Sequence, residues 1–510
     1  MGDAAAGYRT DRFFPRLADP IGVVAADRRL VFATLLLFSL ALRIANFGDW
    51  NFEVDDQWYA LVGHRLLAGD TLYTDIFDRK GPALFLTYSA LAVFGSSVVP
   101  FQIAATLCAA LTAFGTAQIA ARIADARSGL AAGLVLAAMM VVHGGANGQT
   151  PVFYNPLMLV CAWAVITRID LLSRGEIDRR VLAGFGAAGL AIAFKMSAVF
   201  EGVYFGLFAL TVMLRSHGPS PRVFLNAAML ALMGAGPMLA TAAWYLLTGH
   251  FADLWQALVL SNFERTYFSD LERLQRTKLF LTLIWLPLTL ASGSMALLWM
   301  RGEFDAKAGF VLGWVVAAVF AVLVFPAFYV HYILPALPPL CIAMAPIVRR
   351  SRAVTMVALG FAALAVWNSD QVDSASRTQS RAESARLVSY LATELPNRRL
   401  LVWGSPSYLY ELTGSRPPSV LAFPPHLFHM LEAGASGRDE VDETRKILAN
   451  RPDAVVIQSP LTTPVNVAAD DMVRSYVQTC GKVRRFTMRD HFGPQAHTVY
   501  SRCGTDRARR

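Results

Sequence analysis

Residues 51–82 read NFEVDDQWYALVGHRLLAGDTLYTDIFDRKGP and lie between two long apolar runs. The segment gathers many charges in an otherwise apolar sequence, although a run of charges is usually no more than a solvated loop. It also holds many aromatic and aliphatic side chains, among them Trp58, Leu61 and Phe77, which a freely solvated loop does not need. Such side chains favour the membrane–water interface. We therefore predict an ordered loop that folds onto the membrane surface and uses its charges.

The composition is typical of a multi-pass membrane protein. The chain has 510 residues, 55% of them hydrophobic and 16% charged, and its mean hydropathy is +0.43. Soluble domains carry about a quarter charged residues. The formal net charge of +9 comes with Lys and Arg in short loops between apolar runs, where the positive-inside rule accounts for them. We therefore expect the lipid bilayer as a partner and no nucleic acid.

The apolar runs predict a helical membrane domain over residues 30–369. At about 20 apolar residues per crossing, about eleven transmembrane spans are expected. They are Leu30–Asn46, Val98–Ala121, Gly129–Val142, Asn155–Ile166, Val181–Phe194, Val199–Leu214, Val223–Leu247, Leu279–Met300, Ala308–Phe325, Tyr332–Val348 and Val354–Trp367. The short run Ala83–Phe94 is expected to lie in the interface or to re-enter as part of the first outside loop, residues 47–97. Residues 1–29 are expected to form an uncleaved cytoplasmic leader.

The distribution of Lys and Arg between the two sides of the membrane provides a test of this set of spans. If every span crosses, one side of the membrane receives Arg122 and Arg127; Arg168, Arg174, Arg179 and Arg180; Arg215 and Arg222; Arg301 and Lys307; and Arg349, Arg350 and Arg352. The Lys/Arg bias identifies that side as the cytoplasm. An odd number of crossings then places the loop 47–97 and the C-terminal region outside.

The polar region 370–510 predicts a small extracytoplasmic α/β domain, because short strands alternate with helices. The expected strands are Leu400–Trp403, Ala454–Ile457, Val483–Met488 and Thr498–Ser501, and the expected helices are Ser380–Leu395 and Asp439–Asn450. Cys108, Cys161 and Cys341 lie singly in apolar runs without metal-ligand spacing. Cys480 and Cys503 share the polar region, where a disulfide is expected only if this region faces an oxidising compartment.

Three islands of sequence carry a resemblance to a known family. The first comprises DDQWY at 55–59, GDTLYTD at 69–75 and DRKGP at 78–82; the others are FKMSA at 194–198 and HYILPALP at 331–338. Their order and side of the membrane resemble the C-type, lipid-phosphate-sugar-dependent glycosyltransferases. That superfamily includes the protein O-mannosyltransferases, the aminoarabinose transferases acting on lipid A, and bacterial relatives that decorate surface glycans. The resemblance implies a polytopic α-helical membrane domain of the C-type glycosyltransferase fold.

The resemblance also implies roles for the first island. Sugar transfer needs a carboxylate that takes the proton of the attacking acceptor and cations beside the departing phosphate. Asp55 aligns with the family's catalytic carboxylate and is expected to be the general base. Asp56 stands where relatives commonly carry Glu, and it either orients the acceptor or serves as the base itself. Lys80 matches the lysine that contacts the lipid phosphate.

Arg79 departs from the family pattern. The aminoarabinose branch has an acidic residue at this position, which belongs to a metal site. An arginine weakens the expectation of a divalent metal cofactor and favours a purely cationic clamp on the phosphate. We therefore expect no metal-binding residues, without excluding a metal.

Further candidates lie outside the first island. Lys195 sits at an outside turn between two spans, and an ionisable residue at membrane depth is by default a functional candidate, although a snorkelling or Glu201-paired lysine is the alternative. His331 opens a span on the outer side and either donates to the phosphate or is an interfacial residue. The remaining candidates are Arg43 for the phosphate, and Tyr59, Asn155 and Glu201 for substrate or acceptor contact; a helix cap explains Asn155 equally well.

Taken together, these features predict an integral membrane glycosyltransferase of the bacterial inner membrane. It is expected to transfer a hexosyl or pentosyl group from a polyprenyl-phosphate-linked donor to a glycan, lipid or protein on the extracytoplasmic side. By family analogy the transfer inverts the anomeric configuration. The main alternative is a transporter or lipid-linked-sugar flippase, which usually shows two related halves with broken helices. We find no such duplication in the sequence.

Overall fold

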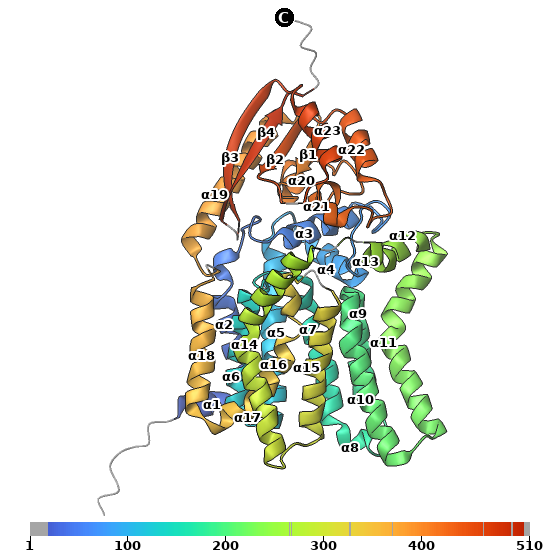
Figure 1. Cartoon of the computed structure of the whole chain (residues 1–510), viewed down its shortest axis with the longest axis vertical. Helices are drawn as coiled ribbons and strands as arrows, with labels where there is room; N and C mark the ends of the chain where they lie inside the picture. Colours follow the sequence, from blue (N-terminus) through green and yellow to red (C-terminus); the bar gives the residue numbers. More distant parts are fainter. Residues whose placement is uncertain are drawn as a thin grey trace, which may run out of the picture.

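A bundle of long helices lies beneath a small α/β domain in the computed structural model of the chain (Figure 1). The structure describes residues 19–264, 266, 268–325, 328–369, 371–462, 464–490 and 493–503. Most of the predicted leader and residue 370, at the predicted start of the outer domain, lie outside these residues. The predicted domain boundaries therefore stay predictions.

Each of the predicted spans coincides with a helix or helix pair of the bundle. These are α2 (Arg28–Ala41), α5 (Val99–Ile123), α6 (Ala126–Val142), α7 (Thr150–Thr167), α9 (Arg179–Phe194), α10 (Val199–His217), α11 (Pro221–Leu247), α14 (Asp270–Met300), α15 (Ala306–Val324), α16 (Leu337–Ala343) with α17 (Ala345–Arg350), and α18 (Arg352–Trp367). Among the described residues, six helices are long and apolar enough to cross a membrane by themselves. The predicted number of crossings therefore stays a prediction, although the bundle itself is clear.

The arginine-bearing connections gather at the end of the bundle that is opposite the α/β domain. The short helices α1 (Pro20–Ala26) and α8 (Ile169–Leu172) lie there together with α17 (Figure 1). Arg349, at the end of α17, reaches Asp125 before α6 at 3.7 Å. The basic loops that were predicted to share one side of the membrane are thus brought to one end of the molecule.

The first outside loop folds into helices at the opposite end of the bundle, where α3 (Val54–Leu67) lies under the α/β domain and α4 (Pro82–Ala92) packs against it (Figure 1). The sequence did not predict α3 as a helix. Residues 56–63 are all buried, so the helix has no polar face and shows no amphipathic period. A Cβ on Gly63 would lie 2.7 Å from the backbone of Tyr88, so the close α3–α4 crossing requires glycine there.

Short elements join the long helices around this end. They are η1 (Ile44–Asn46), η2 (Met196–Ala198), α12 (Phe251–Trp255), the π-helical η3 (Gln256–Leu260), α13 (Ser261–Glu264) and η4 (Val330–Ile333). Both η2 and η4 interrupt the helical path at residues that the sequence singled out, near Lys195 and at His331. The irregular backbone is therefore concentrated where the membrane bundle meets the outer loop.

The C-terminal region forms a four-stranded sheet with helices, as predicted. Its elements are α19 (Ser374–Glu394), β1 (Leu400–Trp403), α20 (Tyr408–Thr413), α21 (Pro424–Phe428), η5 (Met430–Glu432), α22 (Glu440–Ala449), β2 (Ala454–Ser459), α23 (Val467–Val477), β3 (Lys482–Asp490) and β4 (Gly493–Ser501). The strand order is β1-β2-β4-β3; β1 and β2 are parallel and the other pairs antiparallel. The strand β4 begins earlier than predicted because it pairs with β3 along its whole length.

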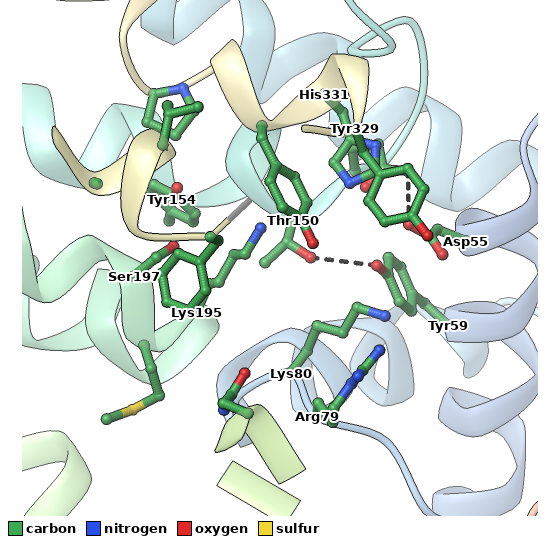
Figure 2. Close-up of a pocket in the computed structure, with 18 of the residues that line it drawn as sticks. Asp55, Tyr59, Arg79, Lys80, Thr150, Tyr154, Lys195, Ser197, Tyr329 and His331 are labelled. Atoms are coloured by element: carbon green, nitrogen blue, oxygen red, sulfur yellow. Dashed lines mark hydrogen bonds between the residues drawn. The ribbon is translucent and has the colours of Figure 1, made fainter. Parts of the chain in front are cut away.

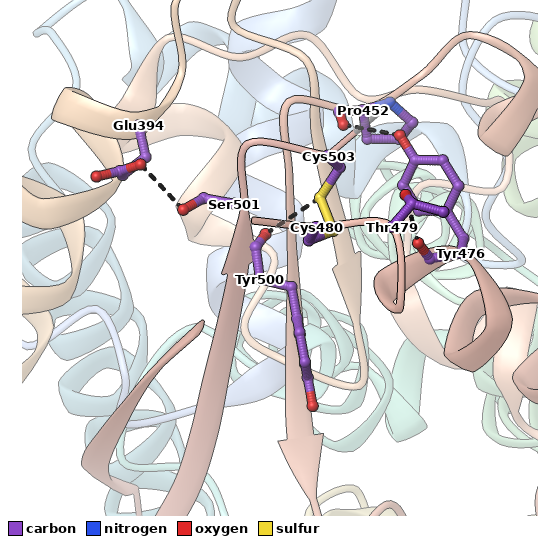
Figure 3. Close-up of a disulfide and its surroundings, with 8 residues drawn as sticks. All are labelled: Glu394, Pro452, Tyr476, Thr479, Cys480, Tyr500, Ser501 and Cys503. Atoms are coloured by element: carbon purple, nitrogen blue, oxygen red, sulfur yellow. Dashed lines mark hydrogen bonds between the residues drawn. A yellow bond between two sulfur atoms is a disulfide. The ribbon is translucent and has the colours of Figure 1, made fainter. Parts of the chain in front are cut away.

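A disulfide joins Cys480, before β3, to Cys503, after β4 (Figure 3). It joins the open end of the β3–β4 hairpin, next to the pair Lys482 and Ser501. Beside it, the Ser501 hydroxyl donates to the Glu394 carboxylate at 3.0 Å. Disulfides persist in oxidising compartments; the extracytoplasmic location of the domain stays a prediction.

A buried ion pair docks the α/β domain on the first outside loop. The Asp49 carboxylate, which is 2% exposed, accepts from the Ser380 hydroxyl at 2.9 Å and lies 3.4 Å from Arg377. The Asn51 amide donates to the carbonyl of Arg489 near the tip of the β3–β4 hairpin at 3.0 Å. Because a buried charge without its partner is costly, these contacts fix the domain directly above α3.

Candidate active site

A cavity of about 350 Å³ opens where the bundle, the first outside loop and the α/β domain meet. Seven of the residues predicted from the sequence line it: Asp55, Tyr59, Arg79, Lys80, Lys195, Glu201 and His331. Figure 2 shows the ends of Lys80 and Lys195 pointing into the same space as Asp55 and His331. Residues that are far apart in the sequence therefore share one chamber.

The carboxylate of Asp55 lies in the first turn of α3, at the positive end of the helix dipole. The side-chain amide of Gln149 donates to its Oδ2 atom at 2.9 Å. Burial by itself would raise the pKa of Asp55, but Lys80, His331, the Gln149 hydrogen bond and Lys195 together lower it to about 2. Asp55 is therefore an ionised hydrogen-bond acceptor at neutral pH.

Lys80 is held in place by Asp78, which is fully buried. Asp78 accepts from the backbone N–H of Lys80 at 2.8 Å and from the indole of Trp58 at 2.7 Å, and its Oδ2 lies 3.5 Å from Lys80 Nζ. Burial opposes the charge on Lys80, but Asp78 and Asp55 outweigh it and raise its pKa. The ammonium group is thus a fixed cation, 5.2 Å from the centre of the Tyr59 ring.

Gly81 brings this lysine next to Lys195. The backbone N–H of Gly81 donates to the carbonyl of Phe194 at 3.0 Å, at the end of α9. A Cβ on Gly81 would lie only 2.0 Å from the carbonyl oxygen of Ala193. Lys195 follows directly, with Nζ 4.4 Å from the centre of the Tyr332 ring. The close approach of two backbones therefore sets the spacing of the two cations.

A Gly81→Ala substitution is expected to push the loop away from α9. Overpacking of this kind costs about 1–3 kcal/mol, and it should lower the thermal unfolding temperature in detergent as well as the affinity for a lipid phosphate. Gly360→Ala on α18 is the matched control, because a Cβ there meets nothing within 4 Å. Equal stability and affinity in both variants would show that the loop does not depend on this contact.

The other lining residues come from separate elements. The ring of His331 lies parallel to that of Tyr329, with centroids 5.8 Å apart. Arg79 forms an ion pair with Glu432 of the α/β domain at 2.8 Å, so the outer domain contributes a charge to the chamber. On α10, Glu201 is buried and accepts from the indole of Trp314 at 2.6 Å.

Three predicted site residues lie behind the cavity wall. Arg43 donates to the carbonyl of Gly145 at 2.9 Å. Asp56 accepts from the backbone N–H of Gly148 at 2.8 Å, and Asn155 donates to the carbonyl of Leu334 at 3.0 Å. None of the three is among the lining residues. Their hydrogen bonds to the backbone of residues 145, 148 and 334 instead fix the two segments that carry Gln149 and His331.

Comparison with known proteins agrees with this architecture. A family model described as dolichyl-phosphate-mannose-protein mannosyltransferase matches residues 82–244. The structure of ArnT from Cupriavidus metallidurans bound to undecaprenyl phosphate has a TM-score of 0.60 at 15% identity, over 92% of this chain and 97% of that chain. Its apo form gives 0.54 at 14% identity over the same shares. No curated protein matches the sequence.

The chain has the C-type glycosyltransferase fold. The resemblance inferred from the three sequence islands is thereby confirmed, and so is the prediction of a multi-pass membrane protein with a small C-terminal sheet domain. Among the residues that the structure describes, no group of three or more His, Cys, Asp or Glu side chains is arranged to hold a metal ion.

Sequence reasoning missed several residues of the site in this C-type fold. Glu53, Gln149 and Thr150 line the cavity, and Glu432 reaches it from the α/β domain. The sequence offered one signal for Gln149 and Thr150, since they end the polar stretch 143–150 between two apolar spans. Glu432 offered none, because its place depends on how a distant domain docks.

An Asp56→Asn substitution tests whether the hydrogen bonds behind the cavity wall position the residues that line the cavity. Asp56 accepts from the Gly148 N–H and from the Tyr88 hydroxyl, whereas an asparagine accepts through one oxygen only. The substitution should loosen the segment that carries Gln149 and lower kcat about 10-fold, which is less than the roughly 100-fold that a 1 Å misplacement can cost. The donor KM should stay nearly unchanged. Asp471→Asn, at an exposed position on α23, is the control and should behave as wild type. A complete loss of activity in Asp56→Asn would instead assign the base to Asp56.

Proposed function

We propose that the chain transfers a sugar from a polyprenyl-phosphate-linked donor to an acceptor nucleophile at the outer face of a bacterial inner membrane. The observation that carries this proposal is the meeting of Asp55 and Lys80 in one chamber, with Lys195 and His331 beside them. A base and a cluster of cations at the membrane surface suit a reaction in which a nucleophile loses a proton and a phosphate departs.

The acceptor atom attacks the anomeric carbon of the donor while the bond from that carbon to the phosphate oxygen breaks. The acceptor proton passes to Asp55, and the electron pair of the broken bond stays on the lipid phosphate. Negative charge therefore grows on the phosphate during the step. Lys80 and Lys195 are fixed cations whose attraction for the phosphate rises as this charge develops. A single displacement of this kind inverts the anomeric configuration.

The charges of the chain support the side of the membrane proposed for this chemistry. The basic connections lie at the end opposite the cavity (Figure 1), and the Lys/Arg bias assigns that end to the cytoplasm. The disulfide in the α/β domain favours an oxidising compartment on the other side. The similar ArnT structure holds undecaprenyl phosphate, and a lipid phosphate of that class fits a cationic chamber at the outer membrane surface.

The direct test is sugar transfer by the purified chain in proteoliposomes that contain a radiolabelled polyprenyl-phosphate sugar. Candidate acceptors are identified by mass spectrometry of surface glycans, lipids and proteins from cells with and without the chain. We expect a labelled acceptor and release of the free lipid phosphate. Movement of intact donor between leaflets, with no release of lipid phosphate, would favour a flippase and overturn the proposal.

A further inference from the structure

Glu53 is a buried carboxyl in the wall of the same chamber that none of the steps above uses. It immediately precedes α3, two positions before Asp55, and its side chain makes no helix-capping hydrogen bond. The residue is 9% exposed and lines the cavity. Within the described part of the chain, no hydrogen bond or ion pair satisfies its carboxyl group.

The surroundings of Glu53 oppose a negative charge. Burial raises its pKa well above the usual range, and the neighbouring carboxylates of Asp56, Asp55 and Asp490 raise it further, while Arg377 opposes them only in part. Arg377 is already paired with Asp49. The surroundings of Glu53 therefore favour its neutral form, whereas those of Asp55 favour its charged form, and a neutral carboxyl offers both an O–H donor and a carbonyl acceptor.

A polar group in this position gains from a substrate partner. The Glu53 oxygens are not among the fully enclosed side-chain atoms that lack a partner in the described structure, and the residue lines the cavity, so a ligand hydroxyl can take the place of water as their hydrogen-bond partner. The departing phosphate is an unsuitable partner, because Lys80 and Lys195 attract it and three nearby carboxylates repel it from Glu53. A hydroxyl group matches a neutral carboxyl, since each group can donate one hydrogen bond and accept another.

We infer that Glu53 is a specificity-determining residue whose carboxyl group hydrogen-bonds a substrate hydroxyl next to the reacting centre. This inference rests on the proposed function, because it takes the chamber to be a sugar-transfer site. The hydroxyl belongs either to the transferred sugar or to the acceptor. Glu53 would form the same hydrogen bonds with either hydroxyl. Kinetic measurements with each substrate distinguish the two possibilities.

Two substitutions at Glu53 test the inference with the full-length chain in proteoliposomes. Glu53→Gln keeps one donor and one acceptor, so it should stay within about 3-fold of wild type in kcat/KM. Glu53→Leu removes both and should lose about 10- to 100-fold, the usual range for one lost hydrogen bond to substrate. The substrate whose KM rises identifies the source of the hydroxyl. Thermal unfolding should change little in either variant, because no hydrogen bond or ion pair of the Glu53 side chain within the described protein is removed.

Deoxy analogues of donor and acceptor give a second, independent measurement on the wild-type chain and on Glu53→Leu. With the wild-type chain, one deoxy analogue should lower kcat/KM by the same factor as the Glu53→Leu substitution does. The Glu53→Leu variant should turn over this analogue and the natural substrate with the same kcat/KM. Wild-type kinetics in Glu53→Leu, or equal loss in Gln and Leu, would overturn the inference and leave the proposed function standing if Asp55→Asn is inactive. Failure of the wild-type chain to transfer any sugar would overturn the proposed function itself.

Discussion

An Asp55→Asn variant is expected to lose about 100- to 10,000-fold in kcat, the range that a general base contributes. Asparagine keeps the size of the side chain and can still accept the hydrogen bond of Gln149, but it cannot take a proton. Donor binding should be retained or strengthened, since a negative charge beside Lys80 has been removed. Transfer from a radiolabelled polyprenyl-phosphate sugar and binding of polyprenyl phosphate, measured side by side, check both expectations.

The pH dependence of the wild-type chain gives a separate check on the same base. Because the pKa of Asp55 is lowered to about 2, its carboxylate is lost only when the pH falls through that low value. The kcat/KM profile, which reports the free enzyme, should therefore show no acid limb from Asp55 above about pH 4, where a group with a pKa of about 2 is almost fully ionised. Asp56, whose pKa burial and Asp55 raise to about 7, would produce a limb near neutrality if it were the base. A neutral limb that disappears in Asp56→Asn would contradict the assignment.

The fold could be predicted in outline because two simple patterns dominate the sequence. Apolar runs of membrane length located the bundle, and the alternation of basic loops ordered it. The helix α3 could not be found in this way. It is enclosed by the bundle on one side and by the α/β domain on the other, so the polar and apolar residues of 54–67 follow no helical period.

The site could be predicted only where a residue carries its own chemical signature. Asp55, Lys80 and Lys195 stand out as charges at the membrane surface, and the cavity brings them together. Arg43 and Asp56 carry the same signature, yet they bond to backbone groups of residues 145 and 148 behind the wall. Burial of this kind depends on how distant segments cross, and no local pattern in the sequence distinguishes a supporting charge from a reacting one.

A Lys80→Met variant is expected to lose about 100- to 1,000-fold in kcat/KM, which is the usual cost of removing one electrostatic contact to a developing charge. Both kcat and donor affinity should fall, because the lysine attracts the bound phosphate and attracts it more strongly as the bond to the sugar breaks. Transfer kinetics at varied donor concentration separate the two effects. Lys80→Arg should recover only part of the loss, since the bulkier guanidinium does not fit the ammonium position between Asp78 and the Tyr59 ring.

The fold should survive the loss of Lys80, so the kinetic result can be interpreted. Asp78 keeps the hydrogen bonds from the Trp58 indole and from the backbone N–H of residue 80, and the contact of Gly81 with α9 is untouched. Lys278→Met, at an exposed position on α14, removes the same charge away from the cavity and should act as wild type. If Lys80→Met matched this control in donor affinity and kcat, the phosphate would have to be held elsewhere. Lys195 and Arg79 would then be the cations to replace next, because they line the same chamber.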